Sequence, residues 1–378
     1  MLPAPKPRGL SLADVLQSCL EAVSGVHNRL GLGVAHNAIV VMVDGLGADV
    51  LRASAGHART LVGAMTSRSV IESGFPTTTA AALATLTTGE SPGRHGMVGY
   101  SILDAAHDRV INQISGWDDR LDPATWQRVP TLFETARERG FDPVVIGPAR
   151  YRESGFTHAV LRGARYVAAA SMGDRARATA EELSTSGAPK LIYVYIPELD
   201  QAAHAHGWQS TEWTTALEMA DAAVRDIVSS LGVRDGLIVT ADHGLLDVPR
   251  HSHVLVEGKL LDGVRFVAGE PRCLQLYFEP DASPQHRENT VDLWRQTEGG
   301  RSWIATRDEA VAAGWFGEVD TEVLPRIGDV LIAARKTIAY YDGRTENRKG
   351  RSMVAQHGSW SPSETRVPLL RFGAFDLA

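Results

Sequence analysis

The sequence has little cysteine, no long apolar run and no excess of positive charge, and each absence excludes a class of protein. Only Cys19 and Cys273 occur in the 378 residues, far apart, so neither a disulfide framework nor a thiolate metal cluster is expected. No segment reaches the roughly 18 apolar residues that a membrane span needs. The formal net charge of −7 provides no basic surface, so we expect neither a nucleic acid polymer nor an anionic membrane as a partner.

What the chain does contain is an ordinary globular composition, with 44% hydrophobic residues, which is enough for a substantial core. The first residues hold charge and proline rather than the apolar segment of a signal peptide, which predicts a cytoplasmic location. No internal repeat or low-complexity segment is evident.

Three short apolar runs lead into aspartates. Residues 38–43 precede Asp44, residues 191–196 precede Asp200 by four positions, and residues 237–241 precede Asp242. Continuous apolar runs of this length, separated by helix-like stretches, predict a largely parallel sheet covered on both faces. Ligands of such α/β sheets bind beyond the carboxyl ends of the strands, so we expect the three aspartates at one edge.

The remaining pattern completes an α/β fold. Helices are expected at 11–24, 131–139, 175–183 and 211–231, with a buried helix that starts after Pro76 and ends at Gly89. Further strands are expected at 143–146, 272–278, 329–334 and 367–370, and further helices at 290–297 and 307–313. We interpret 1–378 as one catalytic domain in which about 250–345 form an inserted α+β subdomain that shapes the rim of the active site.

Carboxylate, imidazole and hydroxyl side chains follow these elements in a set that suits two metal ions. The set is Asp44, Thr79, Asp200, His204, Asp242, His243 and His357. Three carboxylates, three imidazoles and a hydroxyl supply enough ligands for two roughly tetrahedral zinc ions. Two metals about 4 Å apart stabilise both the entering and the departing oxygen of a displacement at phosphorus. The sequence therefore predicts a hydrolase of phosphate esters.

Each residue alone also has a simpler explanation. Asp44 is of a type often found in turns, and so are Asp242 and His243. Asp200 and His204, four positions apart, are also compatible with a side-chain pair on the surface of a helix. His357 before a glycine suits a loop. The combination in one order favours the metal site. Among other candidates, His206, His251 and His253 could touch substrate, although surface or loop positions are favoured. Tyr151 and Phe156 could line the pocket, although core or rim packing is favoured.

Three consecutive threonines, Thr77 to Thr79, stand at the start of the helix that ends at Gly89. A threonine hydroxyl is a poor nucleophile at neutral pH unless it is deprotonated, and contact with a divalent cation achieves this. Unpaired backbone N–H groups and the positive end of the helix dipole would face the phosphate there.

The arrangement resembles the alkaline phosphatase superfamily, and most closely its type I phosphodiesterase and nucleotide pyrophosphatase branch. The residues that carry the resemblance are the Asp44 segment, Phe75-Pro76-Thr77-Thr78-Thr79 through Thr88-Gly89, Pro197-Glu198-Leu199-Asp200 with His204, Thr240-Ala241-Asp242-His243-Gly244, and His357-Gly358. They occur in the family's order over nearly the whole chain. The resemblance implies a three-layer α/β sandwich of the alkaline phosphatase type.

The resemblance also implies roles for individual residues. One zinc would be held by Asp44, Thr79, Asp242 and His243, and the other by Asp200, His204 and His357, although other divalent metals are also compatible. The family's nucleophile is the second threonine of a Phe-Pro-Thr-x-Thr motif, ten residues before the glycine of a Thr-Gly pair, which is Thr79 here. Hydrolysis of a phosphodiester or pyrophosphate bond would pass through a phosphorylated threonine.

Two departures from the family pattern concern the substrate. Thr79 is followed by Ala80-Ala81-Ala82, where family nucleotide pyrophosphatases carry an aromatic residue that stacks on the base. Tyr100 stands where they carry an asparagine that contacts a phosphate oxygen, and its hydroxyl is able to donate the same hydrogen bond. The resemblance therefore supports a small-molecule phosphodiester substrate more strongly than a nucleotide.

Two other functions remain open from the sequence. The same dinuclear site would serve a phosphomonoesterase, a phosphonate hydrolase or a sulfatase. A catalytically silent metal-binding scaffold would keep the same fold. Retention of Thr79, which packing alone does not require, favours an enzyme.

Overall fold

The computed structural model describes residues 1–6, 9–345 and 349–376, and a seven-stranded sheet forms its centre. In spatial order the strands are β2 (Val70–Glu72), β17 (Arg366–Gly373), β8 (Asp235–Thr240), β1 (Asn37–Val43), β7 (Lys190–Ile196), β5 (Asp142–Gly147) and β6 (Arg165–Ala168). The five strands from β8 to β6 are parallel, while β17 is antiparallel to both β8 and β2. This confirms the predicted α/β class.

The central strands β1 and β8 are fully buried, and β7 is buried except at one residue, as their continuous apolar sequences predict. Every residue of β1 is buried, and Ile39 lies beside Ile192 of β7 and Leu237 of β8. The register brings the carboxyl ends of these three strands to one edge, and the N–H of Asp44 donates to the carbonyl of Ile196 there.

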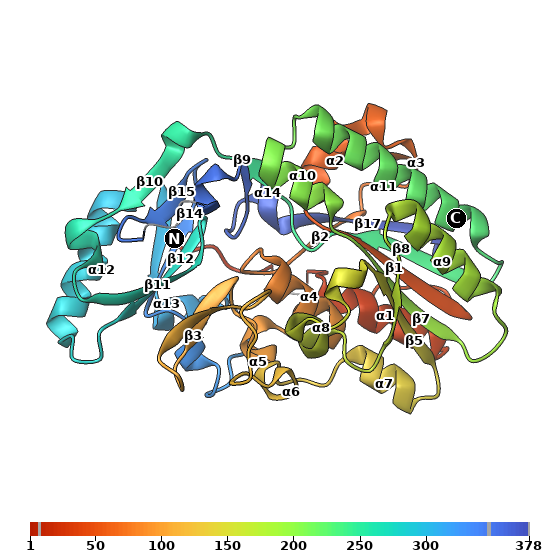
Figure 1. Ribbon diagram of the computed structural model, residues 1–378, viewed down its shortest axis with the longest axis horizontal. Helices are drawn as coiled ribbons and strands as arrows, with labels where there is room; N and C mark the ends of the chain where they lie inside the picture. The colour runs from red at the N-terminus through yellow and green to blue at the C-terminus, as the bar shows by residue number, and fades with distance from the viewer. Residues whose placement is uncertain (7–8, 346–348, 377–378) are drawn as a thin grey trace.

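Helices cover both faces of the sheet, which gives three layers (Figure 1). One face carries α1 (Ala13–Val23), α4 (Thr79–Thr88), α7 (Leu132–Glu138) and α8 (Gly155–Val160). The other carries α2 (Ala48–Ala53), α3 (Arg59–Gly63), α9 (Met172–Ser184), α10 (Glu198–His206), α11 (Thr211–Ser230) and α14 (Pro362–Thr365). Short helices α5 (Pro92–His95) and α6 (Pro123–Trp126) follow α4 in the chain.

A second, antiparallel sheet lies beside the first, on the left in Figure 1. Its strands in spatial order are β11 (Val264–Glu270), β12 (Cys273–Phe278), β14 (Val330–Ala334) and β13 (Ser302–Thr306). Helices α12 (Pro284–Glu298) and α13 (Arg307–Ala312) pack on it. These elements fall inside the stretch 250–345, whose separate status as a subdomain stays a prediction.

Three small two-stranded sheets complete the strand arrangement of the described residues. They pair β3 (Ser101–Asp104) with β4 (Arg109–Asn112), β9 (Leu246–Asp247) with β16 (Ala355–Gln356), and β10 (His253–Val256) with β15 (Ala339–Asp342). A buried ion pair links the turn before β12 to α14, because Nε and Nη2 of Arg272 donate to both carboxylate oxygens of Glu364 at 2.7 and 2.8 Å.

Two properties of the described residues bear on the cellular setting. None of their helices combines the length and apolarity needed to cross a membrane. Cys19 and Cys273 are both buried free thiols.

Candidate metal centre and active site

The threonine segment lies at the start of α4, beyond the carboxyl edge of the sheet. The helix begins at Thr79 and ends at Gly89, whose φ of 73° is the left-handed conformation that ends helices. Thr77 fixes the segment in place, since its hydroxyl donates to the carbonyl of Ser359 and accepts from the N–H of Gly358, both at 2.9 Å. Thr79 is left partly exposed, with its hydroxyl facing His243.

A first group of four residues consists of His243 and three side chains that converge on one of its nitrogens. Its Nε2 lies 3.3 Å from the Thr79 hydroxyl, 3.6 Å from Oδ1 of Asp44 and 3.5 Å from Oδ2 of Asp242. The four residues come from the end of β1, the start of α4 and the end of β8. This is the set that the family resemblance assigns to one zinc.

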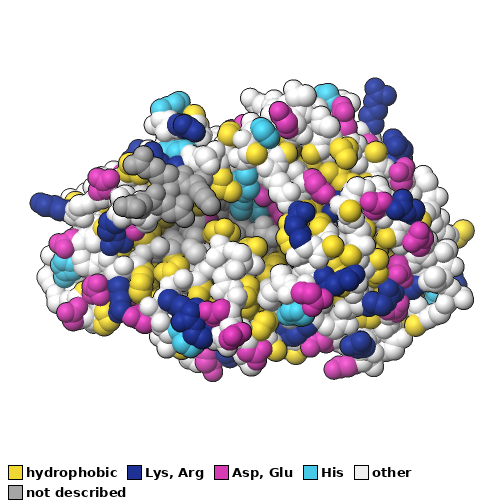
Figure 2. Space-filling model, viewed as in Figure 1, with side chains coloured by type: hydrophobic (Ala, Val, Ile, Leu, Met, Phe, Trp, Pro, Cys, Tyr) yellow, Lys and Arg dark blue, Asp and Glu magenta, His cyan; other side chains and the backbone are white. Residues whose placement is uncertain are grey.

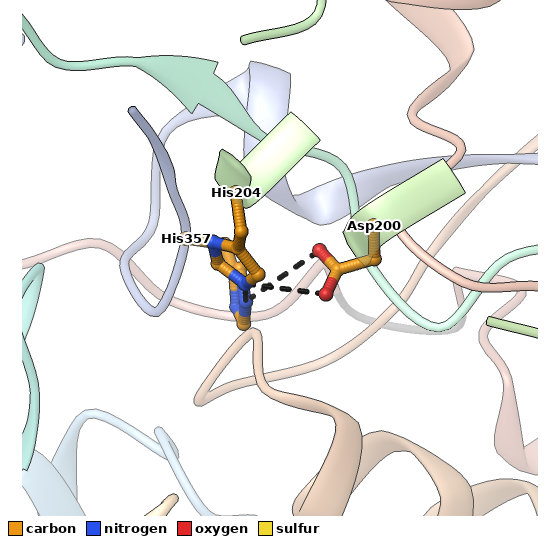
Figure 3. Close-up of side chains that lie close together, drawn as sticks. All are labelled: Asp200, His204 and His357. Carbon is orange, nitrogen blue, oxygen red and sulfur yellow. Dashed lines mark hydrogen bonds and ion pairs between the residues drawn. The ribbon is translucent and has the colours of Figure 1, made fainter. Parts of the chain in front are cut away.

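A second group consists of Asp200, His204 and His357 (Figure 3). Nε2 of His204 lies 3.2 Å from Oδ2 of Asp200 and 3.3 Å from Nε2 of His357. Asp200 and His204 are one turn apart on α10, and His357 follows β16. Figure 3 shows both imidazoles directed toward the carboxylate.

The two groups adjoin each other. The rings of His243 and His357 are stacked with centroids 3.6 Å apart. Asp200 also belongs to a second set of close ligand atoms with Asp44 and His243. The seven residues selected from the sequence are thus assembled at one place, although their roles as ligands stay predictions.

All three imidazoles are held so that Nε2 points into the cluster. Their Nδ1 atoms face backbone carbonyls, at 2.8 Å for His204 and Ala355, 2.7 Å for His357 and Thr77, and 3.2 Å for His243 and Gly244. An Nδ1–H bonded to a carbonyl fixes the tautomer that leaves Nε2 free to bind a metal.

The carboxylates carry oxygens with unmet hydrogen-bonding capacity. Oδ1 of Asp44, Oδ1 of Asp200 and Oδ2 of Asp242 are buried and have no hydrogen-bond partner within the described residues. Burial, followed by the charges of Asp242 and Asp200, raises the pKa of Asp44 well above its ordinary value. Buried acids of this kind are costly without a counter-charge. Three such oxygens and three oriented imidazoles therefore fit two divalent cations.

The imidazoles of His204 and His357 titrate differently. For His204, burial would lower the pKa, but Asp200 outweighs burial and raises the value, so this imidazole has to lose its proton when a metal binds. Burial lowers the pKa of His357 well below its ordinary value, and the neighbouring His243 lowers it further. For Asp200, burial alone would raise the pKa, but His204 and the other imidazoles outweigh it and lower the value. A neutral His357 beside an ionised Asp200 is the protonation state that a metal requires.

A cavity of about 870 Å³ opens in front of both groups. Its lining includes five aromatic residues, Tyr151, Phe156, Tyr166, Tyr193 and Tyr195. It also includes Tyr100, Asn112, Ser115 and Glu270. Figure 2 shows histidine and acidic side chains in the hollow between the two parts of the molecule.

Tyr151 and Phe156, for which the sequence left lining of the pocket open but favoured packing, both line the cavity. Other lining residues were not identified from the sequence. Tyr195, whose hydroxyl donates to Oδ2 of Asp44, and Glu270 received no role from the sequence. No local pattern identifies these positions, since only the tertiary fold brings them to the cavity.

The histidines for which surface or loop positions were expected lie apart from the cavity lining. His206 and His251 are exposed, and His253 is half-buried with Nε2 3.3 Å from the carbonyl of Val248. Tyr100 is 43% exposed and lines the cavity, and its role in substrate binding stays a prediction.

The three-layer fold with candidate metal groups at the carboxyl edge of its sheet defines a protein of the alkaline phosphatase superfamily. The chain belongs to the type I phosphodiesterase / nucleotide pyrophosphatase family, whose sequence model matches residues 38–360.

Solved structures share the fold. Murine ectonucleotide pyrophosphatase/phosphodiesterase 5 gives a TM-score of 0.68 at 14% identity, with 89% of this chain and 88% of the murine chain covered. An inactive variant of that murine protein in complex with AMP gives a TM-score of 0.67 at the same identity and coverage. Phosphonoacetate hydrolase from Sinorhizobium meliloti 1021, in complex with phosphonoacetate, gives a TM-score of 0.66 at 16% identity. That match covers 90% of this chain and 91% of the hydrolase chain. At these identities the similarity establishes the fold alone.

A curated relative matches a shorter region. Ectonucleotide pyrophosphatase/phosphodiesterase 1 of Saccharomyces cerevisiae is 32% identical over 85 residues, which are 20% of this chain and 12% of the yeast protein.

Proposed function

We propose that this chain hydrolyses phosphodiester or pyrophosphate bonds of small molecules, with Thr79 as the nucleophile at a site for two divalent metals. The observation that carries the proposal is the convergence of Thr79, Asp44 and Asp242 on Nε2 of His243, directly beside the second group. A cytoplasmic location stays a prediction from the sequence.

Each group is suited to hold one cation. Asp44, Thr79, Asp242 and His243 would hold the first, and Asp200, His204 and His357 the second. Mixed carboxylate and imidazole ligands favour zinc among the common divalent ions. When bound, the two cations supply Lewis acidity to the phosphoryl group and lower the pKa of hydroxyl groups that contact them.

The residues of the chain then act in two steps. In the first, the Thr79 hydroxyl loses its proton and its oxygen forms a bond to phosphorus, while the bond to the departing alcohol breaks and that alcohol takes up a proton. This leaves a threonine phosphate ester that still carries the other ester arm of the substrate. The free N–H groups in the first turn of α4 face the phosphoryl oxygens and stabilise their charge. In the second step water attacks phosphorus, the bond to Thr79 breaks, and the hydroxyl is restored.

The size of the cavity favours a diester over a small phosphonate. A volume of about 870 Å³ lies near the upper end of the range typical of ligand pockets, and both aromatic and polar side chains line it. Phosphonate, monoester and sulfate substrates remain the alternatives against which this proposal is tested.

The test is a reconstituted protein whose metal content is measured by mass spectrometry and whose kcat/KM is compared across bis-aryl phosphate, aryl phosphate, aryl phosphonate and aryl sulfate esters. We expect two zinc ions per chain and the highest value for the diester. A protein with two zinc ions that hydrolyses none of them is a scaffold, and a higher kcat/KM for another ester class would replace the diesterase assignment.

The nucleophile is tested with Thr79→Ala and, as a matched control, Thr78→Ala. Thr78 is the adjacent buried threonine, and its side chain forms no capping hydrogen bond. We expect Thr79→Ala to abolish turnover. It should also abolish the covalent threonine phosphate ester that mass spectrometry detects in acid-quenched wild type, while Thr78→Ala retains both. Normal turnover in Thr79→Ala would rule out Thr79 as the nucleophile.

A further inference from the structure

Glu270 is a buried acid that lines the cavity but belongs to neither candidate metal group. It is the last residue of β11 and only 4% exposed. Its Oε2 accepts a hydrogen bond from the N–H of Tyr100 at 2.9 Å, whereas Oε1 has no hydrogen-bond partner within the described residues. A buried carboxylate oxygen without a donor is costly, so a structural role alone does not account for it.

The side chain is firmly positioned against the segment that carries His357. Gly358 has a φ of 132°, and a Cβ at that position would lie 2.2 Å from Cγ of Glu270. Two residues beyond Glu270, Arg272 forms its buried ion pair with Glu364, which in turn accepts from the N–H of Ser359. Such positioning on rigid elements is typical of a group that recognises a ligand.

Glu270 is not neutralised by a cation from the described part of the chain. It forms no ion pair with any of those residues, because the nearby Arg272 is committed to Glu364. Burial raises the pKa of Glu270 to about 8, the Tyr100 N–H opposes the shift, and Glu364 adds to it. Below about pH 8 the unliganded protein therefore holds this carboxyl protonated, and a cationic donor from outside the chain would favour its ionised form.

The surroundings indicate where that donor comes from. Glu270 lines the same cavity as the polar residues Asn112 and Ser115 and as Tyr100. A diester bound with its phosphate at Thr79 would extend its ester arms into this cavity. An arm that reaches Glu270 would meet the carboxyl group whose Oε1 has no partner within the described residues.

We propose that Glu270 is a specificity-determining residue that accepts a hydrogen bond from a hydroxyl or ammonium group on the polar ester arm of the substrate. This inference rests on the proposed diesterase function. It assigns the substrate class as an asymmetric diester with one aromatic or apolar arm and one arm that carries a hydrogen-bond donor.

The test uses three p-nitrophenyl phosphodiesters whose second alcohol is ethanol, ethylene glycol or ethanolamine. We expect metal-loaded wild-type protein to prefer the glycol and ethanolamine esters over the ethyl ester by about tenfold or more in kcat/KM. Glu270→Ala should remove both preferences while hydrolysis of the ethyl ester continues. Glu270→Gln should keep most of the preference for the glycol ester and lose that for ethanolamine, because the amide keeps an acceptor but not the charge.

Glu279→Gln serves as the matched control, because it makes the same chemical change at an exposed position just after β12. It should leave the preference unchanged. Equal kcat/KM for the three esters in wild type, or a preference that survives in Glu270→Ala, would overturn the assignment of Glu270. Failure of wild type to hydrolyse any of the three would instead overturn the proposed function, and this inference with it.

Folding and binding are checked separately from turnover. Metal content and near-UV circular dichroism of each variant should match wild type. In the Thr79→Ala background, titration calorimetry should show that Glu270→Gln weakens binding of the ethanolamine ester and not of the ethyl ester. Equal weakening for both would indicate a structural effect and contradict the proposal.

Discussion

Two tyrosines on β7 differ in whether their hydroxyl group has a hydrogen-bond partner at the candidate metal centre. Tyr193 and Tyr195 lie on the same side of the strand with stacked rings, and both line the cavity. The hydroxyl of Tyr195 donates to Asp44, whereas the buried hydroxyl of Tyr193 has no partner within the described residues. Only Tyr195 therefore supports a proposed metal ligand.

Tyr195→Phe should weaken metal binding while Tyr193→Phe does not. Loss of a hydrogen bond to a ligating carboxylate typically lowers metal affinity about 10- to 100-fold. Competition with a chromophoric chelator measures the zinc dissociation constants. Equal affinities in the two variants would show that the Tyr195 hydroxyl does not tune the site.

Glu270 predicts a pH dependence of stability in the metal-free protein. Its pKa is raised from 4.5 to about 8, so between these values the folded protein holds a proton that the unfolded chain has lost. Stability contributed by the proton is complete below pH 4.5 and is lost as the pH rises through 8. Each pKa unit of difference between the folded and unfolded states changes the free energy of unfolding by at most about 1.4 kcal/mol.

Glu270→Gln removes this titration. Relative to wild type, the free energy of unfolding of the variant should therefore increase between about pH 5 and about pH 8.5. Urea denaturation in the presence of EDTA measures it, and the difference between the two proteins cancels titration of other groups. A difference that is independent of pH would show that Glu270 is already ionised in the folded protein.

At the level of elements, the segment after β16 links the threonine segment that precedes α4, a proposed ligand and the second sheet. Gly358 donates its N–H to Thr77, follows His357 and packs against Glu270. Its φ of 132° is accessible to glycine and strained for other residues.

Gly358→Ala should reduce kcat/KM by at least about tenfold, because the added methyl must displace Glu270 or shift His357 and Thr77. Gly350→Ala is a suitable control, since the nearest atom to its Cβ is 3.7 Å away. Steady-state kinetics with the diester measure the effect. Normal kinetics in Gly358→Ala would show that the segment adapts without disturbing the site.

The elements that carry the proposed ligands could be predicted because each has a local signal. The apolar run before Asp44 became β1, and the helix expected to end at Gly89 became α4. Thr131, at the start of an expected helix, forms a capping box on α7. These signals depend on neighbouring residues, so a single sequence contains them.

The cavity wall could not be predicted in the same way. Strands β11 and β13 were not expected, and β11 contains Gly269 at a positive φ, which weakens its strand pattern. Glu270 precedes Pro271 and has the sequence character of a surface turn, yet packing against Gly358 buries it. Which residues face the substrate is thus decided by contacts between distant segments.

For the whole molecule, the acidic cluster makes stability depend on metal. Asp44, Asp200 and Asp242 are brought together in the core, and within the described residues no lysine or arginine pairs with them. Metal bound a thousandfold above its dissociation constant would stabilise the folded state by about 4 kcal/mol.

Removal of the metal should therefore lower the melting temperature, and restored zinc should raise it again. Asp242→Asn provides the contrast: it removes one charge beside Asp44, so its metal-free form should melt above metal-free wild type, and zinc should raise its melting temperature less. Differential scanning calorimetry with and without EDTA measures both. Identical melting curves for wild type in the two conditions would argue against a metal centre.

None of the seven proposed metal ligands lies on the four-stranded sheet, whereas Glu270 does. Substitutions on that sheet can therefore alter which esters are accepted while the hydrolytic apparatus stays intact. Relatives that share the catalytic half could evolve new substrate preferences by exchanging side chains on this one wall. The buried Arg272–Glu364 contact, which joins the wall to the catalytic half, would then be the feature that such divergence has to preserve.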